Sequence, residues 1–334
     1  MNNNEFVCRE LNLRQTASFL KKHDNFIILT HTSPDGDTLG SAYALYYGLK
    51  ETGKIASVIC PDLIPSKYGY FARETDHIED LQTATVVAVD VADKKLLGSL
   101  SDMFGDIVDL NIDHHISNTN FAKNRYLDAN ASATAECIYE LLEEMDVNIN
   151  TITAKALYTG IATDTGCFKY SNVTAKTHMI AAALYEFDIK ADEINRIMFD
   201  TKSRKLLELE RMVLDTAEYH FDNRCIILSV TADMQEKTGC SGPDLEGIAV
   251  ISRSVEGVLA GVTIKQTDMQ EFKVSLRTYE PMNAAKICKM LGGGGHNAAA
   301  GATVRGDLQT VKNQILAAIK ECMEEIDAGT CTAE

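Results

Sequence analysis

The segment most informative about the fold is Ile107-Val108-Asp109-Leu110-Asn111-Ile112-Asp113-His114-His115-Ile116, in which an apolar strand pattern runs directly into an acid and two adjacent imidazoles. The apolar runs at 26–30 and 85–89 have the same form. The first leads into His31-Thr32-Ser33-Pro34-Asp35-Gly36-Asp37 and the second into Asp90. Polar groups at the carboxyl ends of strands are typical of open α/β sheets, which bind ligands at that edge. The three runs therefore predict parallel strands that share a ligand site.

Helical patterns alternate with these strands through the first part of the chain. A fourth acidic signature, Thr163-Asp164-Thr165-Gly166, follows one of them. The predicted strands are 26–30, 56–60, 85–89 and 107–112, and the predicted helices are 38–52, 133–145, 151–162 and 175–185. Strands that alternate with helices predict a mainly parallel sheet.

The chain is long enough for two domains, because 334 residues exceed the usual size of one core. The pattern changes to charged helix near residue 188. Beyond it, strands are predicted at 225–231, 258–266 and 272–277, and helices at 245–252, 283–291 and 308–325. We therefore expect an α/β protein with a mainly parallel-sheet N-terminal domain and a smaller α/β C-terminal domain. The expected boundaries are 1–188 for the first domain, 189–220 for a helical connector, 221–326 for the second domain and 327–334 for a polar tail.

Composition narrows the class of protein. A formal charge of −16 argues against a protein that grips long duplex DNA, which would need a broad basic surface. No apolar stretch approaches the length of a membrane span. Nine cysteines without a C-x-x-C pair are typical of reduced thiols rather than of a disulfide framework or a zinc site. We expect a cytoplasmic enzyme with a compact site.

The four acidic signatures would repel one another if they converged, and a pair of divalent cations is the natural compensation. Carboxylates and imidazoles without thiolates suit manganese, and to a lesser degree magnesium, cobalt or zinc. Two acids in one loop can serve one metal each, and an acid at the end of the neighbouring strand can bridge both. The predicted metal ligands are His31, Asp35, Asp37, Asp90, His114 and Asp164.

Three residues are expected to act in the reaction itself. Two metals roughly 3.5–4 Å apart can hold a bridging hydroxide and clamp a phosphoryl group, with Asp90 as the shared carboxylate. His115 would face the substrate as a phosphate ligand or as a proton donor to the leaving oxygen. Asp113 would orient an imidazole by a hydrogen bond.

The second domain carries a glycine run, Gly292-Gly293-Gly294-Gly295-His296. Glycines let the backbone approach a nucleotide closely and turn N–H groups toward phosphate. His296 and Arg277 would add charge-assisted donors. The alternative is a flexible hinge with His296 as an ordinary surface residue. The expected substrate-binding residues are Gly293, Gly294, Gly295, His296 and Arg277, with Arg253 as a further candidate.

The ordered motifs resemble the DHH phosphoesterase superfamily, named for the Asp-His-His found here at 113–115. The glycine run and the strand 274–278 resemble the first type of DHH-associated C-terminal domain. The combination is most similar to the bacterial nanoRNase/pAp phosphatase branch. This resemblance implies that His31, Asp35 and Asp90 hold one manganese ion and that Asp37, Asp90, His114 and Asp164 hold the other. It also implies that the C-terminal domain closes over the cleft and contacts the substrate.

The activity that the resemblance implies is manganese-dependent hydrolysis of short oligonucleotides to mononucleotides, and of 3'-phosphoadenosine 5'-phosphate (pAp) to AMP and phosphate. The expected partners are short RNA or DNA oligonucleotides or pAp, with no duplex nucleic acid and no membrane. The sequence leaves a homodimer as an open alternative. Magnesium or cobalt is the alternative metal. The alternative functions are a free-standing phosphodiesterase for cyclic or linear diadenylate, a single-strand exonuclease of the same superfamily and, less favoured, a non-enzymatic nucleotide sensor.

Overall fold

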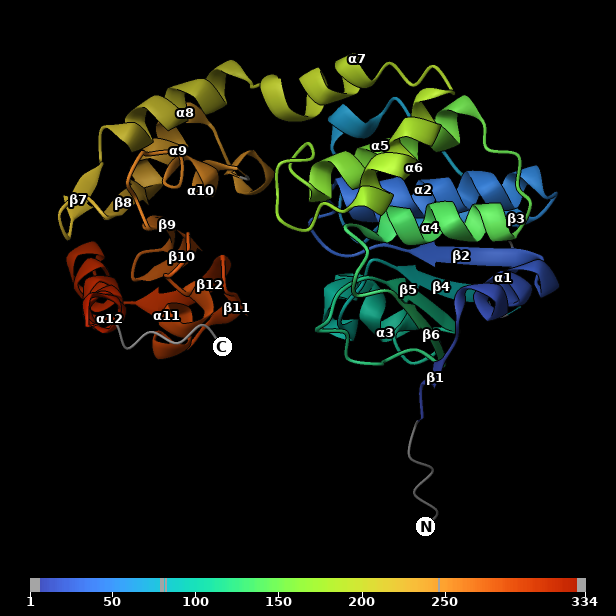
Figure 1. Ribbon diagram of the computed structural model, residues 1–334, viewed down its shortest axis with the longest axis horizontal. Coiled ribbons are helices and arrows are strands. Elements are labelled where there is room, and N and C mark those ends of the chain that lie inside the picture. Colours follow the sequence, from blue (N-terminus) through green and yellow to red (C-terminus); the bar gives the residue numbers. More distant parts are fainter. Residues whose placement is uncertain (1–6, 79–80, 82, 246, 329–334) are drawn as a thin grey trace, which may run out of the picture. The chain divides into compact units, whose positions relative to one another are not determined.

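The computed structural model describes residues 7–78, 81, 83–245 and 247–328 (Figure 1). The chain divides into two compact units, Met1–Thr201 and Lys202–Glu334, and each contains a six-stranded sheet. The residues expected to form a connector are shared between the units. Helix α7 (Ala191–Asn195) and the π-helical segment η3 (Arg196–Asp200) belong to the first unit, and α8 (Arg204–Leu214) belongs to the second.

The first unit is built on a parallel sheet with strand order β1-β6-β5-β4-β2-β3. Its strands are β1 (Arg9–Glu10), β2 (Asn25–Leu29), β3 (Ile55–Ile59), β4 (Thr85–Val89), β5 (Leu110–Asp113) and β6 (Asn124–Leu127). From β2 the chain passes to β3 at one edge of the sheet, and then returns to β4 on the other side of β2 and continues through β5 to β6. The direction therefore changes between the neighbours β2 and β4, which is where open α/β sheets bind ligands. The predicted mainly parallel α/β architecture is confirmed.

Helices cover both faces of this sheet, because its strands bury side chains on both sides (Figure 1). The helices are α1 (Leu13–Lys22), α2 (Gly36–Glu51), α3 (Ser101–Phe104), α4 (Thr134–Glu144), α5 (Thr151–Asp164) and α6 (Ala175–Tyr185), with short 3₁₀ segments η1 (Ser66–Tyr68) and η2 (Lys94–Leu100). Alternate strand residues such as Phe26 and Ile28 join the larger cluster with α2, α4 and α5. Ile27 and Leu29 join the smaller cluster with Leu97 and Phe104.

Helices α2 and α5 approach each other closely because glycines lie at their contact. A Cβ atom on Gly40 would lie 2.5 Å from the carbonyl oxygen of Ala156, and one on Gly160 would lie 2.9 Å from Asp37 Oδ1. A Cβ atom on Gly36 would collide with the side chain of Thr163. The beginning of α2 and the end of α5 are therefore adjacent, which brings two of the acidic signatures together.

The second unit has a mixed sheet with strand order β11-β12-β10-β9-β8-β7, in which only the β8–β9 pair is parallel among the described strands. Its strands are β7 (Glu218–His220), β8 (Cys225–Val230), β9 (Ala260–Asp268), β10 (Glu271–Thr278), β11 (Gly294–His296) and β12 (Ala299–Arg305). Its helices are α8, α9 (Ala232–Thr238), η4 (Gly242–Leu245), α10 (Ile248–Ile251), α11 (Ala284–Met290) and α12 (Leu308–Asp327). The predicted smaller α/β domain is confirmed.

Two features complete the description of the chain. Helix α12 extends to Asp327, which pairs with Arg224 at 2.6 Å, and residues 329–334 of the predicted polar tail lie outside the described residues. Every helix in the described part of the chain is too short or too polar to cross a lipid bilayer.

Candidate metal centre

The structure brings all six predicted metal ligands together at the carboxyl edge of the first sheet. His31, Asp90 and His114 follow the neighbouring strands β2, β4 and β5. The remaining three come from helix ends: Asp35 precedes α2, Asp37 lies in its first turn, and Asp164 is the last residue of α5. The meeting of strand ends and helix ends at this edge explains why residues so distant in sequence converge.

The first group of ligand atoms comes from His31, Asp35 and Asp90. His31 Nε2 lies 3.7 Å from Asp35 Oδ1 and 3.6 Å from Asp90 Oδ2. The Nδ1 atom of His31 donates to the carbonyl oxygen of Thr32 at 2.7 Å, which leaves Nε2 available to a cation. Asp35 Oδ1 also caps α2 by accepting from the backbone N–H of Thr38 at 3.1 Å. The carboxylate of Asp35 therefore caps the beginning of α2 and also lies in the first group of ligand atoms.

The second group comes from Asp37, His114 and Asp164. His114 Nε2 lies 3.5 Å from Asp164 Oδ2 and 4.0 Å from Asp37 Oδ2. Its Nδ1 atom donates to the carbonyl oxygen of Ala131 at 3.1 Å. Asp90 faces this group as well, since its Oδ1 lies 3.9 Å from His114 Nε2 while its Oδ2 faces His31. One buried carboxylate is thus shared between the two groups.

The backbone of Asp90 adopts a left-handed conformation, with φ of 60°. This conformation is uncommon for a residue other than glycine and is concentrated at functional sites. The N–H group of Asp90 donates to the carbonyl oxygen of Ile112 at 2.9 Å, so the sheet still holds the turn. The turn aims the side chain of Asp90 between the two groups.

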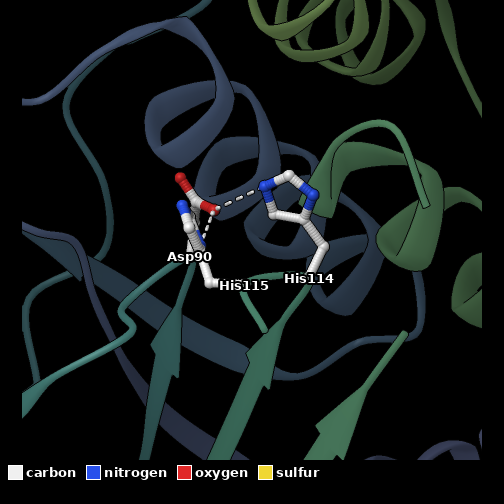
Figure 2. A group of neighbouring side chains, drawn as sticks. All are labelled: Asp90, His114 and His115. Atoms are coloured by element: carbon white, nitrogen blue, oxygen red, sulfur yellow. Dashed lines mark ion pairs between the residues drawn. The ribbon is translucent and has the colours of Figure 1, made fainter. Parts of the chain in front are cut away.

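His115 forms a third group with Asp90 and His114, and Figure 2 shows the two imidazoles beside the carboxylate of Asp90. His115 Nδ1 lies 3.5 Å from Asp90 Oδ1 but donates to Asp113 Oδ1 at 2.7 Å. Asp113 is fully buried, and its other oxygen accepts from Asn118 Nδ2 at 2.6 Å. Burial opposes protonation of His115, but the hydrogen bond with Asp113 and the negative charges of Asp90, Asp113 and Asp164 together raise the pKa of His115 to about 9. Asp113 therefore fixes the ring of His115.

The acidic groups of the centre repel one another. Burial and repulsion from Asp90 raise the pKa of Asp37. Burial and repulsion from Asp90 raise the pKa of Asp164 to about 7, although the nearby His114 acts in the opposite direction. Burial opposes protonation of His31, but its hydrogen bonds with Asp35 and Asp90 raise its pKa to about 11.

Divalent cations fit this donor set. Every donor atom in the three groups is a carboxylate oxygen or an imidazole nitrogen, a set that suits manganese or magnesium better than soft metals. A cation would also replace the protons that the crowded carboxylates retain, because metal ligands must be deprotonated.

The sequence motifs do not include the residues that hold the ligands in place. Thr134 Oγ1 donates to Asp90 Oδ1 at 2.7 Å, and the N–H groups of Thr134 and Ala135 donate to Asp37 at 2.6 and 2.9 Å. Asn118 holds Asp113. These partners lie as far as 98 residues from the ligand in sequence, so spacing alone does not mark them.

The residues predicted to bind substrate lie in the second unit. Arg277 of β10 pairs with Ala299 of β12, and Ala299 pairs with His296 of β11. Residues directly opposite in an antiparallel sheet share a face, so Arg277 and His296 point to the same side with only a small alanine between them. Arg253 lies over the ring of Tyr279 at 5.2 Å.

The glycine run forms part of the sheet rather than an open loop. Gly294, Gly295 and His296 make up β11, the edge strand, so one side of their backbone pairs with β12. A Cβ atom on Gly293 would collide with the carbonyl oxygen of Gly301, and the φ of 77° at Gly292 favours glycine. A cavity of about 400 Å³ lies beside the run and is lined by Lys273, Gly292, Gly293, Gly301, Ala302 and Thr303.

Known families and proteins resemble this chain along most of its length. The family model described as the DHH family, N-terminal domain, matches residues 25–161, and that of the DHHA1 domain matches residues 222–325. The bifunctional oligoribonuclease and PAP phosphatase NrnA of Thermus thermophilus is 33% identical over 317 residues, which cover 92% of this chain and 94% of that protein. The protein of the same name from Bacillus subtilis is 27% identical and covers 84% of this chain and 90% of its own length.

Solved structures share the fold. An exopolyphosphatase-related protein from Bacteroides fragilis superposes with a TM-score of 0.83 at 25% identity, covering 92% of this chain and 95% of that one. RecJ of Thermus thermophilus in complex with Mn²⁺ superposes with a TM-score of 0.57 at 15% identity, covering 92% of this chain and 55% of RecJ.

Proposed function

Because this chain belongs to the DHH family and is a phosphoester hydrolase, we propose that its substrates are short oligonucleotides and pAp. The observation that carries the proposal is the convergence of six candidate ligands into two groups, with Asp90 in the first and only 3.9 Å from His114 of the second. Relatives named as oligoribonuclease and PAP phosphatase support the substrate class, since the first of them aligns over 92% of this chain.

We assign His31, Asp35 and Asp90 to one cation, and Asp37, Asp90, His114 and Asp164 to the other. Two bound divalent cations supply Lewis acidity, which lowers the pKa of water and offsets the charge of a phosphate. Manganese is the proposed native ion, with magnesium and cobalt as alternatives, because the donors are oxygens and imidazole nitrogens.

His115 is the proposed proton donor. Its Nδ1 atom is committed to Asp113, so Nε2 is the atom that can face the substrate. The buried carboxylate of Asp113 accepts this hydrogen bond and so favours the protonated ring. His115 can therefore hydrogen-bond a phosphate oxygen and pass its proton to the ribose oxygen that leaves when the P–O bond breaks. Asp113 positions the ring and stabilises its charge.

The second unit is proposed to recognise substrate phosphate through Arg277, His296 and the glycines 293–295, with Arg253 as a further contact. Arg277 and His296 share one face of the sheet, so they can act on one anionic group. A net charge of −16 leaves few cations to follow a longer backbone, so additional nucleotides should add little affinity and duplex nucleic acid should bind poorly. Free buried thiols such as Cys137 and Cys225 suit the reducing cytoplasm, where we place the reaction.

A substrate profile tests this proposal. Purified protein with manganese is assayed at matched concentrations of pAp, a dinucleotide, a pentanucleotide, a long single strand, cyclic diadenylate and pyrophosphate. We expect the highest kcat/KM for the dinucleotide and pAp, with release of mononucleotides or of AMP and phosphate. Asp90→Asn serves as the inactive control.

The other outcomes of the profile contradict the proposal in different ways. A clearly higher kcat/KM on the long strand would make the protein a processive exonuclease. Preference for cyclic diadenylate would make it a diadenylate phosphodiesterase. Binding without turnover of every compound would make it a nucleotide sensor.

A further inference from the structure

One short segment, residues 131–135, contacts the ligands of the second group from several directions. The carbonyl oxygen of Ala131 accepts from His114 Nδ1 at 3.1 Å. The N–H groups of Thr134 and Ala135 donate to the two oxygens of Asp37 at 2.6 and 2.9 Å. Thr134 Oγ1 donates to Asp90 Oδ1 at 2.7 Å. Three of the four ligands assigned to one cation are therefore held by residues 131, 134 and 135.

The fourth ligand, Asp164, is tied to the same segment through Asn172. The Nδ2 group of Asn172 donates to the carbonyl oxygen of Ser132 at 2.9 Å and to the carbonyl oxygen of Asp164 at 3.1 Å. One side-chain amide thus joins the end of α5 to residue 132. All four ligands of the second group are therefore bonded to segment 131–135, either directly or through Asn172.

Segment 131–135 forms the beginning of helix α4. Ala133 occupies the capping position of this helix and carries only a methyl group, so the carboxylate of Asp37 supplies the acceptor that a capping side chain would normally provide. The positive end of the helix dipole favours negative charge at this position. Asp37 is therefore held in its ligand position by α4 as well as by its own helix, where Ser41 Oγ donates to it at 3.0 Å.

Segment 131–135 is itself held by hydrogen bonds and ion pairs with residues that are not candidate ligands. Ser132 Oγ donates to Glu136 Oε1 at 2.5 Å, and Glu136 is fully buried. Lys176 Nζ lies 4.0 Å from the other oxygen of Glu136 and 3.2 Å from Asp128. These contacts hold the segment through groups that are not candidate metal ligands.

The first group shares Asp90, but Thr134 bonds to Oδ1 of Asp90, which faces His114, whereas Oδ2 faces His31. The other two ligands of the first group are held by different residues. His31 bonds to the carbonyl of Thr32, and Asp35 accepts from the backbone N–H groups of Asp37 and Thr38. A change in segment 131–135 should therefore affect one cation more than the other.

We propose that segment 131–135 is a positioning frame for the second cation, with Thr134 as the positioning residue for Asp90 and Asn172 as the positioning residue for Asp164. The proposal rests on the assignment of metal ligands under the proposed function. Groups that orient metal ligands typically change metal affinity by about 10- to 100-fold when they are removed.

The test uses the full-length protein after removal of metal, titrated with Mn²⁺ by calorimetry and by electron paramagnetic resonance. Thr134→Val removes the hydroxyl at constant size, and Thr134→Ser keeps the hydroxyl as the matched control. Asn172→Leu removes the bridging amide. We expect Thr134→Val and Asn172→Leu to weaken one Mn²⁺ site by about 10- to 100-fold while the other stays within a factor of about two. Thr134→Ser should bind two ions as the unchanged protein does.

Two results would overturn the frame: equal weakening of both sites in Thr134→Val, or the same loss in Thr134→Ser as in Thr134→Val. Circular dichroism of each metal-free variant establishes that it is folded. The titration is independent of substrate. If the unchanged protein binds two Mn²⁺ ions but fails to cleave short oligonucleotides, the substrate assignment falls and the frame stands.

Discussion

Removal of divalent metal should destabilise the first unit and leave the second unchanged. The metal centre is confined to residues 31–164 of the first unit, where its candidate ligands include the buried carboxylates of Asp37, in the first turn of α2, and Asp90, directly after β4. A ligand that binds only the folded state at 100 times its Kd stabilises it by ~2.7 kcal/mol, so two ions contribute about 5 kcal/mol. For a unit of this size each kcal/mol moves Tm by ~2–4 °C. We therefore expect excess Mn²⁺ to raise the Tm of the first unit by about 10–20 °C over chelated protein.

Differential scanning calorimetry of the full chain, with chelator and with excess Mn²⁺, measures this shift. Asp90→Asn should show less than half of the shift, because it removes the carboxylate that faces both groups. Asp102→Asn, at an exposed position in α3, is the matched control and should keep the full shift. The two-cation reasoning is refuted if Mn²⁺ leaves every transition in place, or if Asp90→Asn responds as fully as Asp102→Asn.

Three further predictions concern single residues. His114→Ala should lower Mn²⁺ occupancy, whereas His115→Ala should keep occupancy and lower kcat, because the Nδ1 atom of His115 is committed to Asp113; metal analysis of both variants decides this, and equal metal loss would contradict the division of roles. Arg277→Ala should reduce kcat/KM on phosphate-terminated dinucleotides, since a lost charge-assisted hydrogen bond costs ~1.5–3 kcal/mol, with Tm unchanged; steady-state kinetics unchanged from the native protein would remove Arg277 from the substrate site. Gly160→Ala should destabilise the first unit by ~1–3 kcal/mol despite the better helix propensity of alanine, because its Cβ atom would lie 2.6 Å from that of Ala135 in α4. Denaturant unfolding measures this, and a stabilised variant would show that α4 and α5 can separate without cost.

The central strands and the place of the candidate ligands at their ends could be predicted, because His31, Asp90 and His114 follow strong apolar patterns. The apolar run 85–89 coincides with β4, and Asp90 follows it directly. The same logic placed His31 after β2 and His114 after β5. Because the carboxyl ends of parallel strands lie at one edge of a sheet, the sequence pattern was enough to predict that these residues lie together.

Elements without such patterns could not be predicted. Strand β6 reads Asn124-Arg125-Tyr126-Leu127, which has no apolar run, and it exists because β5 and β1 flank it. The glycine run contains β11 because β12 provides a partner, although glycine has low strand propensity. The contacts of Thr134 and Asn172 depend on how helices pack, which spacing along the chain does not report.

The double use of Asp37 bears on how a substrate complex could be trapped for crystallography. Its carboxylate accepts the first N–H groups of a helix that begins 97 residues later, so it joins two helices as well as facing the second group. An inactive variant made at Asp37 would expose those N–H groups and loosen the architecture that is to be observed. Asp164 accepts from Asn172 through its backbone carbonyl, and the side chain of His115 is partly exposed. Substitutions at these two positions are therefore the better choice for an inactive variant that keeps its fold and still binds the nucleotide.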